Sequence, residues 1–343
     1  MRTQRLLGIA AIGLLSVSCG KLRGLAGQVK RSAETKAAAT IDASKSAGTT
    51  PDPVLQALVD QTPEGAVFRK DLPFPEQLQV KVERRFTFNS ARVLVKSAIG
   101  NQSAVLSGTR YFTTVYARTG ERVALTMESA GFSLPVAGKA AAAVAAPVVP
   151  EPPVELTRSK DLAGGTISLT RHGKRWQAQH VSDFKFAAWG SELEPSMGAL
   201  CMDAGVLPRA YWFGPRRLKP GETVPLAGAA LALLLGEGAS GALGLKLESF
   251  EASGGHPCGV FSVTGDYHAA GVPGPDGEVF DQEVSISSGK VWLSLVYPVV
   301  IREQLETVQT LVSGARSSHS IRIQGAVSVA VTREWQQTPA AAK

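Results

Sequence analysis

The chain has 343 residues, 44% of them hydrophobic, which suffices for the core of one large domain or two ordinary ones. Much of its net charge of +7 lies near the N-terminus, where residues 19–50 hold six basic residues against Glu34 and Asp42. These basic residues are not interleaved with aromatic ones, which argues against nucleic-acid binding. After Leu15, no apolar run reaches the ~18 residues of a membrane-spanning helix.

The first 18 residues have the pattern of an export signal. Arg2 and Arg5 precede the short apolar run Leu6–Leu15, and small residues lead to Cys19. Residues 15–19, Leu-Ser-Val-Ser-Cys, resemble the lipobox of bacterial lipoproteins. The resemblance implies that residues 1–18 are removed and that Cys19, acylated with fatty acids such as palmitate, anchors the mature chain in the membrane.

The residue after Cys19 bears on which membrane this is. In Gram-negative lipoproteins an aspartate there favours inner-membrane retention, and this chain has Gly20. The resemblance therefore implies the periplasmic face of the outer membrane. Residues 19–50 are predicted to be a basic, flexible tether, with a short interfacial helix as the alternative. Their charge would favour anionic head groups or cell-wall polymer, unless the segment is only a solvated spacer.

Residues 51–135 are predicted to be a small β-rich segment. Pro53 opens a short helix, an alternating strand follows with a bulge at Glu83–Arg85, and a hairpin turns at Thr119-Gly120. The alternating apolar positions of the strand are Leu78, Val80, Val82, Phe86 and Phe88. The segment either folds alone or adds its strands to the next one.

Residues 136–155, rich in Ala and then Pro, are predicted to be a linker, and 156–335 the main β-rich domain, followed by a disordered tail, 336–343. The main domain begins with a hairpin and continues with the helix Glu192–Ala204, which Gly205 ends. The two strands of that hairpin are predicted at Thr166–Thr170 and Arg175–Val181.

The rest of the main domain is predicted to be strands. Its strands are Ala229–Leu235, Leu243–Glu251, Gly259–Tyr267, Glu283–Ser287, Val291–Tyr297 and a clear alternating one at 321–335. Ser287–Lys290 is predicted to be a turn, and Ile301–Val312 suits a helix or a strand.

The predicted fold class is therefore mainly β, with a minor α+β character. A strand with one apolar face needs a partner layer, so we expect a curved antiparallel sheet, as a half-barrel or a sandwich, with one or two helices. The order of elements resembles the half-barrel folds of bacterial envelope lipoproteins and lipoprotein carriers. That resemblance implies a curved sheet around a helix and an apolar cavity.

With Cys19 acylated, two cysteines remain, Cys201 and Cys258. In an exported domain a pair of cysteines predicts one disulfide, and two buried thiols are the alternative.

Motifs that would signal catalysis, a cofactor or a metal are present only as fragments. The G-x-G-x-x-G at 236–241 precedes strand spacing where a dinucleotide site needs a helix. Two S-x-x-K matches, 182–185 and 287–290, fall outside helices, and Pro-Asp-Gly at 275–277 is a turn signature rather than a calcium loop. Four ligand-type side chains match no metal module in their spacing, and they are His256, Cys258, Asp266 and His268. We therefore predict no catalytic residue, cofactor or metal.

One aromatic and basic segment is a candidate ligand site. Stacking and charge there would suit a glycan or a lipid head group. Its residues are Tyr211, Trp212, Phe213, Arg216 and Arg217. The alternative is a strand that enters the core, followed by a solvated basic loop.

The sequence thus favours a lipid-anchored, non-enzymatic binding or accessory module for an envelope ligand, lipid or partner protein. The first alternative is a structural component of an envelope complex without a ligand cavity. The second is an envelope hydrolase that uses residues such as Asp266 and His268.

Overall fold

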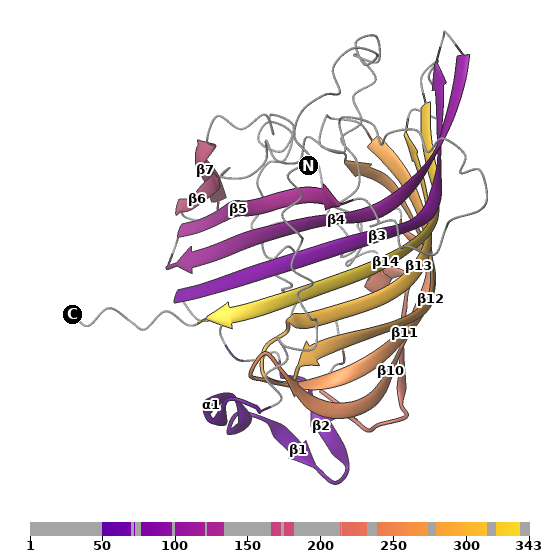
Figure 1. Cartoon of the computed structure of the whole chain (residues 1–343). Coiled ribbons are helices and arrows are strands. Elements are labelled where there is room, and N and C mark those ends of the chain that lie inside the picture. The colour runs from indigo at the N-terminus through magenta and orange to yellow at the C-terminus, as the bar shows by residue number, and fades with distance from the viewer. Residues whose placement is uncertain are drawn as a thin grey trace, which may run out of the picture.

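Long antiparallel strands make up most of the computed structural model (Figure 1). The structure describes residues 50–69, 72, 77–97, 100–120, 122–133, 166–172, 175–181, 213, 215–231, 239–273, 279–313 and 320–336. Its elements are α1 (Pro53–Gln56), β1 (Asp60–Thr62), β2 (Gly65–Val67), β3 (Gln77–Ser97), β4 (Gly100–Thr119), β5 (Arg122–Ser133), β6 (Thr166–His172), β7 (Arg175–Val181), β8 (Arg217–Leu218), β9 (Thr223–Ala227), β10 (Ser240–Ser253), β11 (His256–Pro273), β12 (Val279–Ser294), β13 (Val300–Ser313) and β14 (Ser320–Gln336).

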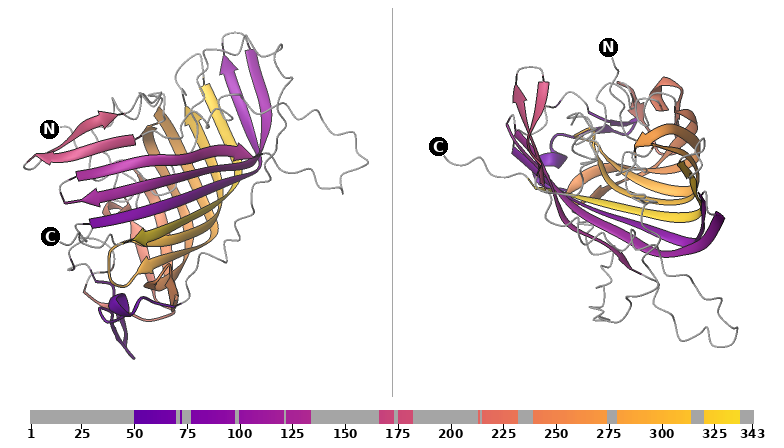
Figure 2. Two further views of the ribbon diagram at one scale, coloured as in Figure 1. Left: turned by 60° about the vertical axis from the view of Figure 1, so that its left-hand side comes forward. Right: turned by 90° about the horizontal axis from the view of Figure 1, so that it is seen from above.

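One curved sheet of 11 strands dominates the fold, in the order β7-β6-β5-β4-β3-β14-β13-β12-β11-β10-β9. Seen from above, the strands bend around a common interior (Figure 2). The predicted mainly-β, curved antiparallel class is confirmed. The three long strands of 51–135, β3 to β5, are part of this sheet, because β3 pairs with β14 and β5 pairs with β6. Of the two alternatives for that segment, adding strands to the main domain is the one observed.

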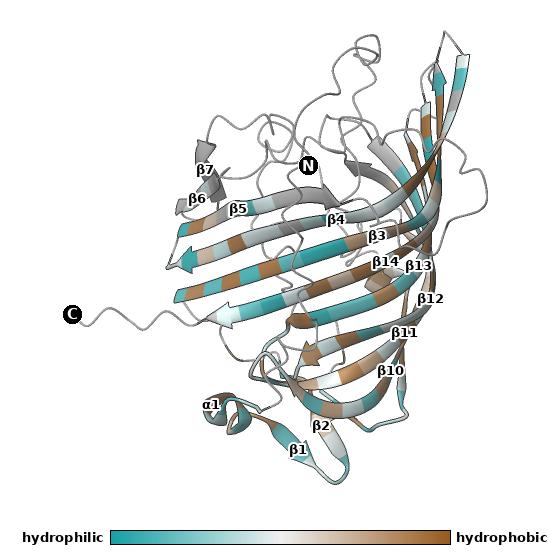
Figure 3. Ribbon diagram, in the orientation of Figure 1, coloured by the Kyte–Doolittle hydropathy of each residue, from teal (hydrophilic) through white to brown (hydrophobic). Residues whose placement is uncertain are grey.

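The core lies on the concave face because apolar and polar residues largely alternate along the strands. Along β3 the even-numbered positions from Leu78 to Phe88 are apolar except Arg84, and Figure 3 shows the resulting bands of hydrophobic and hydrophilic residues. Leu305 of β13 and Val263 of β11 belong to the same buried cluster as Phe86. Adjacent antiparallel strands place paired residues on one face, so this cluster is continuous across the sheet.

A second, smaller cluster lies on the opposite face of β11. Cys258 and Val260 alternate with Gly259 and Phe261, and only Phe261 belongs to the main cluster. Leu55 of α1 packs into the smaller cluster. The short helix predicted at Pro53 is therefore present, with Asp52 as its N-cap, accepting from the Val54 amide at 2.8 Å.

The segment that follows the predicted tether is docked at one end of the sheet, at the bottom of Figure 1. The Asp52 amide donates to the Gly255 carbonyl at 2.8 Å, and the Arg69 amide donates to the Leu295 carbonyl at 3.0 Å. Phe68 contacts the rings of Phe213 and Phe261, with centroids 4.6 and 5.4 Å away. This segment also forms a small sheet, β1-β2-β8.

Three local predictions were wrong. The bulge expected at Glu83–Arg85 lies instead at Phe88–Ala91, where Ser90 has φ of 56°. Residues 287–290 are not a turn, because β12 continues through them with a register shift between Ile286 and Ser288. Residues 229–231 are helical, and the strand expected there lies earlier, as β9. The first two differences concern where a long strand is irregular, which its pairing partners decide.

Other predictions stand. Residues 301–312 are a strand, since β13 pairs with β14 along its length. The hairpins β4–β5 and β6–β7 are present, with Gly120 at φ 54° in the first turn. The predicted signal, tether, linker, helix at 192–204 and tail lie outside the described residues, apart from Thr50 and Gln336, the last residue of β14.

Candidate functional site

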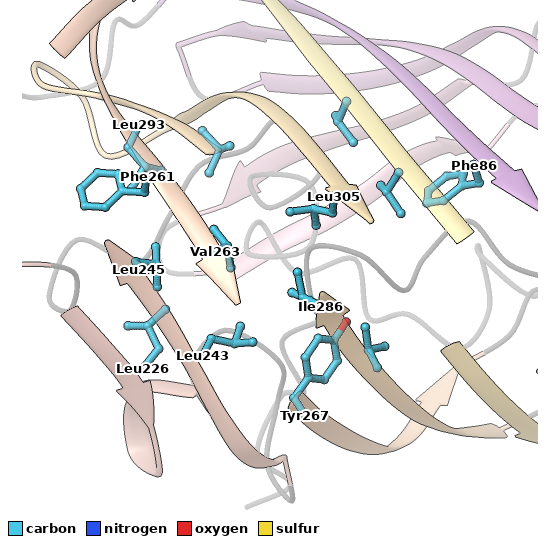
Figure 4. Packing of buried hydrophobic residues seen from close by; sticks show 14 of the residues in the cluster. Phe86, Leu226, Leu243, Leu245, Phe261, Val263, Tyr267, Ile286, Leu293 and Leu305 are labelled. Carbon is cyan, nitrogen blue, oxygen red and sulfur yellow. The ribbon is translucent and has the colours of Figure 1, made fainter. Parts of the chain in front are cut away.

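The concave face carries a few polar side chains inside its apolar cluster. They lie on strands that also carry the aliphatic and aromatic residues of the main cluster, several of which Figure 4 shows. Gln282 on β12, Gln309 on β13 and Tyr267 on β11 are 0%, 2% and 5% exposed. Such groups are normally hydrogen-bonded when buried, so each requires an explanation.

The strand register brings these three side chains together. Val284 pairs with Tyr267 on one side and with Gln309 on the other. Gln282 is two residues from Val284 on the same face, opposite Ala269 and Leu311. Gln282 is therefore diagonal to both of the others, at roughly 7–8 Å, and Tyr267 and Gln309 lie two strand spacings apart across Val284, roughly 10 Å. We call Tyr267, Gln282 and Gln309 the polar triad.

Part of the triad has no hydrogen-bond partner. The Gln309 amide nitrogen donates to the Thr307 hydroxyl at 2.9 Å, and Thr307 donates to the Val327 carbonyl at 2.7 Å. Four triad atoms have none in the part of the chain that the structure describes: Oε1 of Gln309, both amide atoms of Gln282 and the Tyr267 hydroxyl. Burying such atoms unpaired destabilises the fold by about 1–3 kcal/mol per group.

A buried ion pair lies on the same face. Arg333 of β14 donates to Glu303 Oε1 at 2.7 Å and to the Val300 carbonyl at 3.2 Å. The two side chains are 2% and 1% exposed. The pKa of Tyr267 is raised, first by burial and then by the Glu303 carboxylate, so its hydroxyl stays protonated at neutral pH.

Arg110 on β4 is a further buried cation, beside Phe86 in the strand register. Burial lowers its pKa to about 10, so it remains charged at neutral pH.

A Ser-His-Asp combination occurs in the smaller cluster. His256 Nδ1 lies 3.3 Å from Ser294 Oγ, and Asp52 is close enough to act on the pKa of His256. Burial dominates, however, and lowers that pKa to about 4, so the imidazole is neutral at pH 7. Ser294 Oγ also accepts the amides of Val296 and Tyr297 at 3.2 Å each.

This combination is not arranged for nucleophilic catalysis. Ser294 and His256 are 3% and 4% exposed, and Oγ already accepts two backbone hydrogen bonds. A nucleophile must reach a substrate carbonyl, which this burial prevents. The three residues hold the turn after β12 and the docked N-terminal segment in place.

Cys258 is buried beside this group. Its thiol donates to the His256 carbonyl at 3.3 Å, and burial raises its pKa far above the ordinary value. Cys201 lies outside the described residues, so the bridge between Cys201 and Cys258 stays a prediction.

The aromatic and basic segment splits into different environments. Phe213 is buried and stacks on Phe261 with centroids 5.1 Å apart. Arg217 forms an ion pair with Asp60 at 2.6 Å, whereas Arg216 is exposed. Tyr211 and Trp212 lie outside the described residues. Phe213 is thus part of the core and Arg217 is paired on β8, and ligand binding by this segment stays a prediction.

The candidate metal and hydrolase residues are spread along one strand. His256 is ten residues from Asp266 on β11, roughly 33 Å at the usual rise of an extended strand. Asp266 is exposed and His268 half-buried. In the part of the chain that the structure describes, no three His, Cys, Asp or Glu side chains gather as metal ligands would.

Sequence reasoning missed the polar triad and the ion pair. Gln282 is in phase with Val284 and Ile286, and Glu303 and Gln309 are in phase with Leu305. A polar residue at an inward position of an alternating strand was the available signal. For Glu303 and Gln309 this signal was hidden, because 301–312 also suited a helix. In a helix these two residues would not share a face with Leu305 in the same way.

Comparison with known proteins adds no relative. No family model matches the chain, and neither does any curated protein. Among the described residues, no helix is long and apolar enough to cross a membrane.

Proposed function

We propose that this protein is a lipid-anchored, non-enzymatic binding module of the outer membrane, which holds an apolar envelope ligand against the concave face of its sheet. The observation that carries the proposal is the polar triad, in which four polar atoms have no partner among the described residues, inside a continuous apolar cluster. Small-molecule sites have this composition, an apolar lining with a few placed polar groups that orient the ligand.

The environment of the nucleophile-type and acid–base side chains favours binding over catalysis. Cys258 is held as a thiol by burial, and Ser294 is engaged by backbone amides. His256 contacts Ser294 and the ring of Trp335 inside the smaller cluster, away from the triad. These groups stabilise the end of the sheet where the N-terminal segment docks.

The anchor comes from the N-terminal sequence. The lipobox-like residues 15–19 and Gly20 support attachment through acylated Cys19 at the periplasmic face of the outer membrane. The basic segment 19–50 would add attraction to anionic head groups, by about 1 kcal/mol per basic residue near the surface. The docked segment from residue 50 onward would then hold the sheet close to the membrane.

The test is the intact mass of the native full-length protein, extracted in mild detergent and measured before and after organic extraction. We expect a chain that begins at acylated Cys19 and carries additional mass that the solvent removes. An acylated chain without cargo would favour a structural component of an envelope complex instead. An unmodified Cys19 would remove the anchor from the proposal.

A further inference from the structure

We propose that the polar triad, Tyr267, Gln282 and Gln309, binds the uncharged polar group of a neutral acyl lipid, such as an ester, amide or hydroxyl. This inference rests on the proposed function, because it specifies the ligand that the concave face would hold. It assigns the head group to the triad and the acyl chain to the apolar residues beside it.

The hydrogen-bonding capacity of the triad is that of a neutral site. Gln282 offers two N–H donors and a carbonyl acceptor, and it uses none of them within the described residues. Gln309 has committed its amide nitrogen to Thr307, which leaves its oxygen as an acceptor. The Tyr267 hydroxyl both donates and accepts. A carbonyl with an adjacent hydroxyl or N–H complements this set.

The charges nearby disfavour an anionic head group. Glu303 is close enough to Tyr267 to raise its pKa, so an anion bound at the hydroxyl would meet a carboxylate. The cation on the same face, Arg333, is already paired with Glu303 at 2.7 Å. Arg110, the other buried cation among the described residues, lies on β4, three strands from β13. Among the described residues, no unpaired buried cation would thus accompany an anion at the triad.

Aliphatic and aromatic side chains beside the triad suit an acyl chain. Ile286 is two residues from Val284 on the same face of β12. Leu243 is two residues from Gly241, the residue of β10 that pairs with Tyr267. Figure 4 shows Tyr267, Ile286, Leu243 and Leu305 directed toward one interior. An acyl chain there would bury its methylene groups against residues that are themselves shielded from water.

The experiment compares two probes that share one acyl chain, monooleoylglycerol and oleate. Their binding to the full-length protein in detergent is measured by displacement of a fluorescent acyl probe. We expect monooleoylglycerol to bind at least tenfold more tightly than oleate. Gln282→Leu and Tyr267→Phe should each weaken its binding severalfold, whereas Gln324→Leu, the same change at an exposed position of β14, should not.

A second measurement separates a binding role from a structural one. Because the Gln282 amide and the Tyr267 hydroxyl have no partner in the described part of the chain, Gln282→Leu and Tyr267→Phe should raise the urea midpoint of unfolding or leave it unchanged. Variants that lose stability and binding together would overturn the inference. Equal binding of both probes, or tighter binding of oleate, would overturn it and leave the binding module standing. Binding of neither probe would count against the module itself.

Discussion

Two buried groups of polar side chains lie on opposite faces of the sheet, and they differ in how their polar atoms are satisfied. In the smaller cluster, Ser294 bonds to His256 and accepts the backbone amides of Val296 and Tyr297. In the main cluster, the triad leaves four atoms without a partner in the described part of the chain. Satisfied groups specify a fold, whereas unsatisfied ones destabilise it and need another reason to persist.

The Glu303–Arg333 pair belongs with the satisfied groups although it shares the concave face with the triad. Its position shows that the concave face itself does not prevent pairing. The triad differs because its side chains are uncharged and leave four atoms without a partner among the described residues. The four predictions that follow test other contacts of the fold.

The largest effect is expected from breaking the buried ion pair. Arg333→Leu leaves Glu303 charged and buried, and should reduce the free energy of unfolding by about 3–5 kcal/mol. The double variant Glu303→Leu with Arg333→Leu should lose less than either single variant, since no charge is left unpaired. Urea denaturation measures both, and a double variant that is no better than the singles would show that the pair acts through packing.

The next effect is a pH dependence from His256. Its folded pKa of about 4 lies below its ordinary value of 6.5, so the unfolded chain binds the proton more readily. Its contribution is fully present above pH 6.5 and declines as pH falls toward 4. The loss reaches about 3 kcal/mol at pH 4.

Urea denaturation at pH 7.5 and at pH 4.5 measures this dependence. His256→Gln cannot be protonated and should reduce the difference between the two pH values. An unchanged difference in this variant would show that other groups carry the acid sensitivity.

A smaller effect tests the contact between the docked segment and the main core. A Cβ at Gly259 would lie 2.5 Å from the ring tip of Phe68, so Gly259→Ala should destabilise by about 1–3 kcal/mol. Gly244→Ala on the neighbouring strand β10 is the matched control, because its Cβ would meet nothing closer than 3.9 Å. Equal thermal midpoints for the two variants would mean that the Phe68 ring does not pack against Gly259 in solution.

The smallest effect is expected at the surface pair of Arg217 and Asp60. The two side chains are 33% and 47% exposed, so Arg217→Ala should cost about 0.2–1 kcal/mol and the cost should shrink in high salt. A loss above 2 kcal/mol in urea denaturation would indicate that β8 depends on this pair. The surface pair would then contribute as much to the free energy of unfolding as the buried groups do.

Much of the fold class followed from local patterns. Alternation at Ile321, Ile323, Val327, Val329 and Val331 predicted β14, because successive side chains of a strand point to opposite faces. Thr119-Gly120 predicted the hairpin β4–β5 by its turn chemistry. The irregularities at Phe88–Ala91 and Ile286–Ser288 were not predictable, since a bulge depends on the partner strand.

By itself, the sequence determined that this protein is mainly β and where several strands and turns lie, because period-2 patterns and turn residues act over a few positions. Only the tertiary structure decided that β3 pairs with β14, more than 200 residues away, and that β13 is a strand. It also decided which polar residues are buried together: Tyr267, Gln282 and Gln309 come from three strands, and their proximity depends on register. Register is set by pairing across the whole sheet, and a single strand's sequence does not contain it.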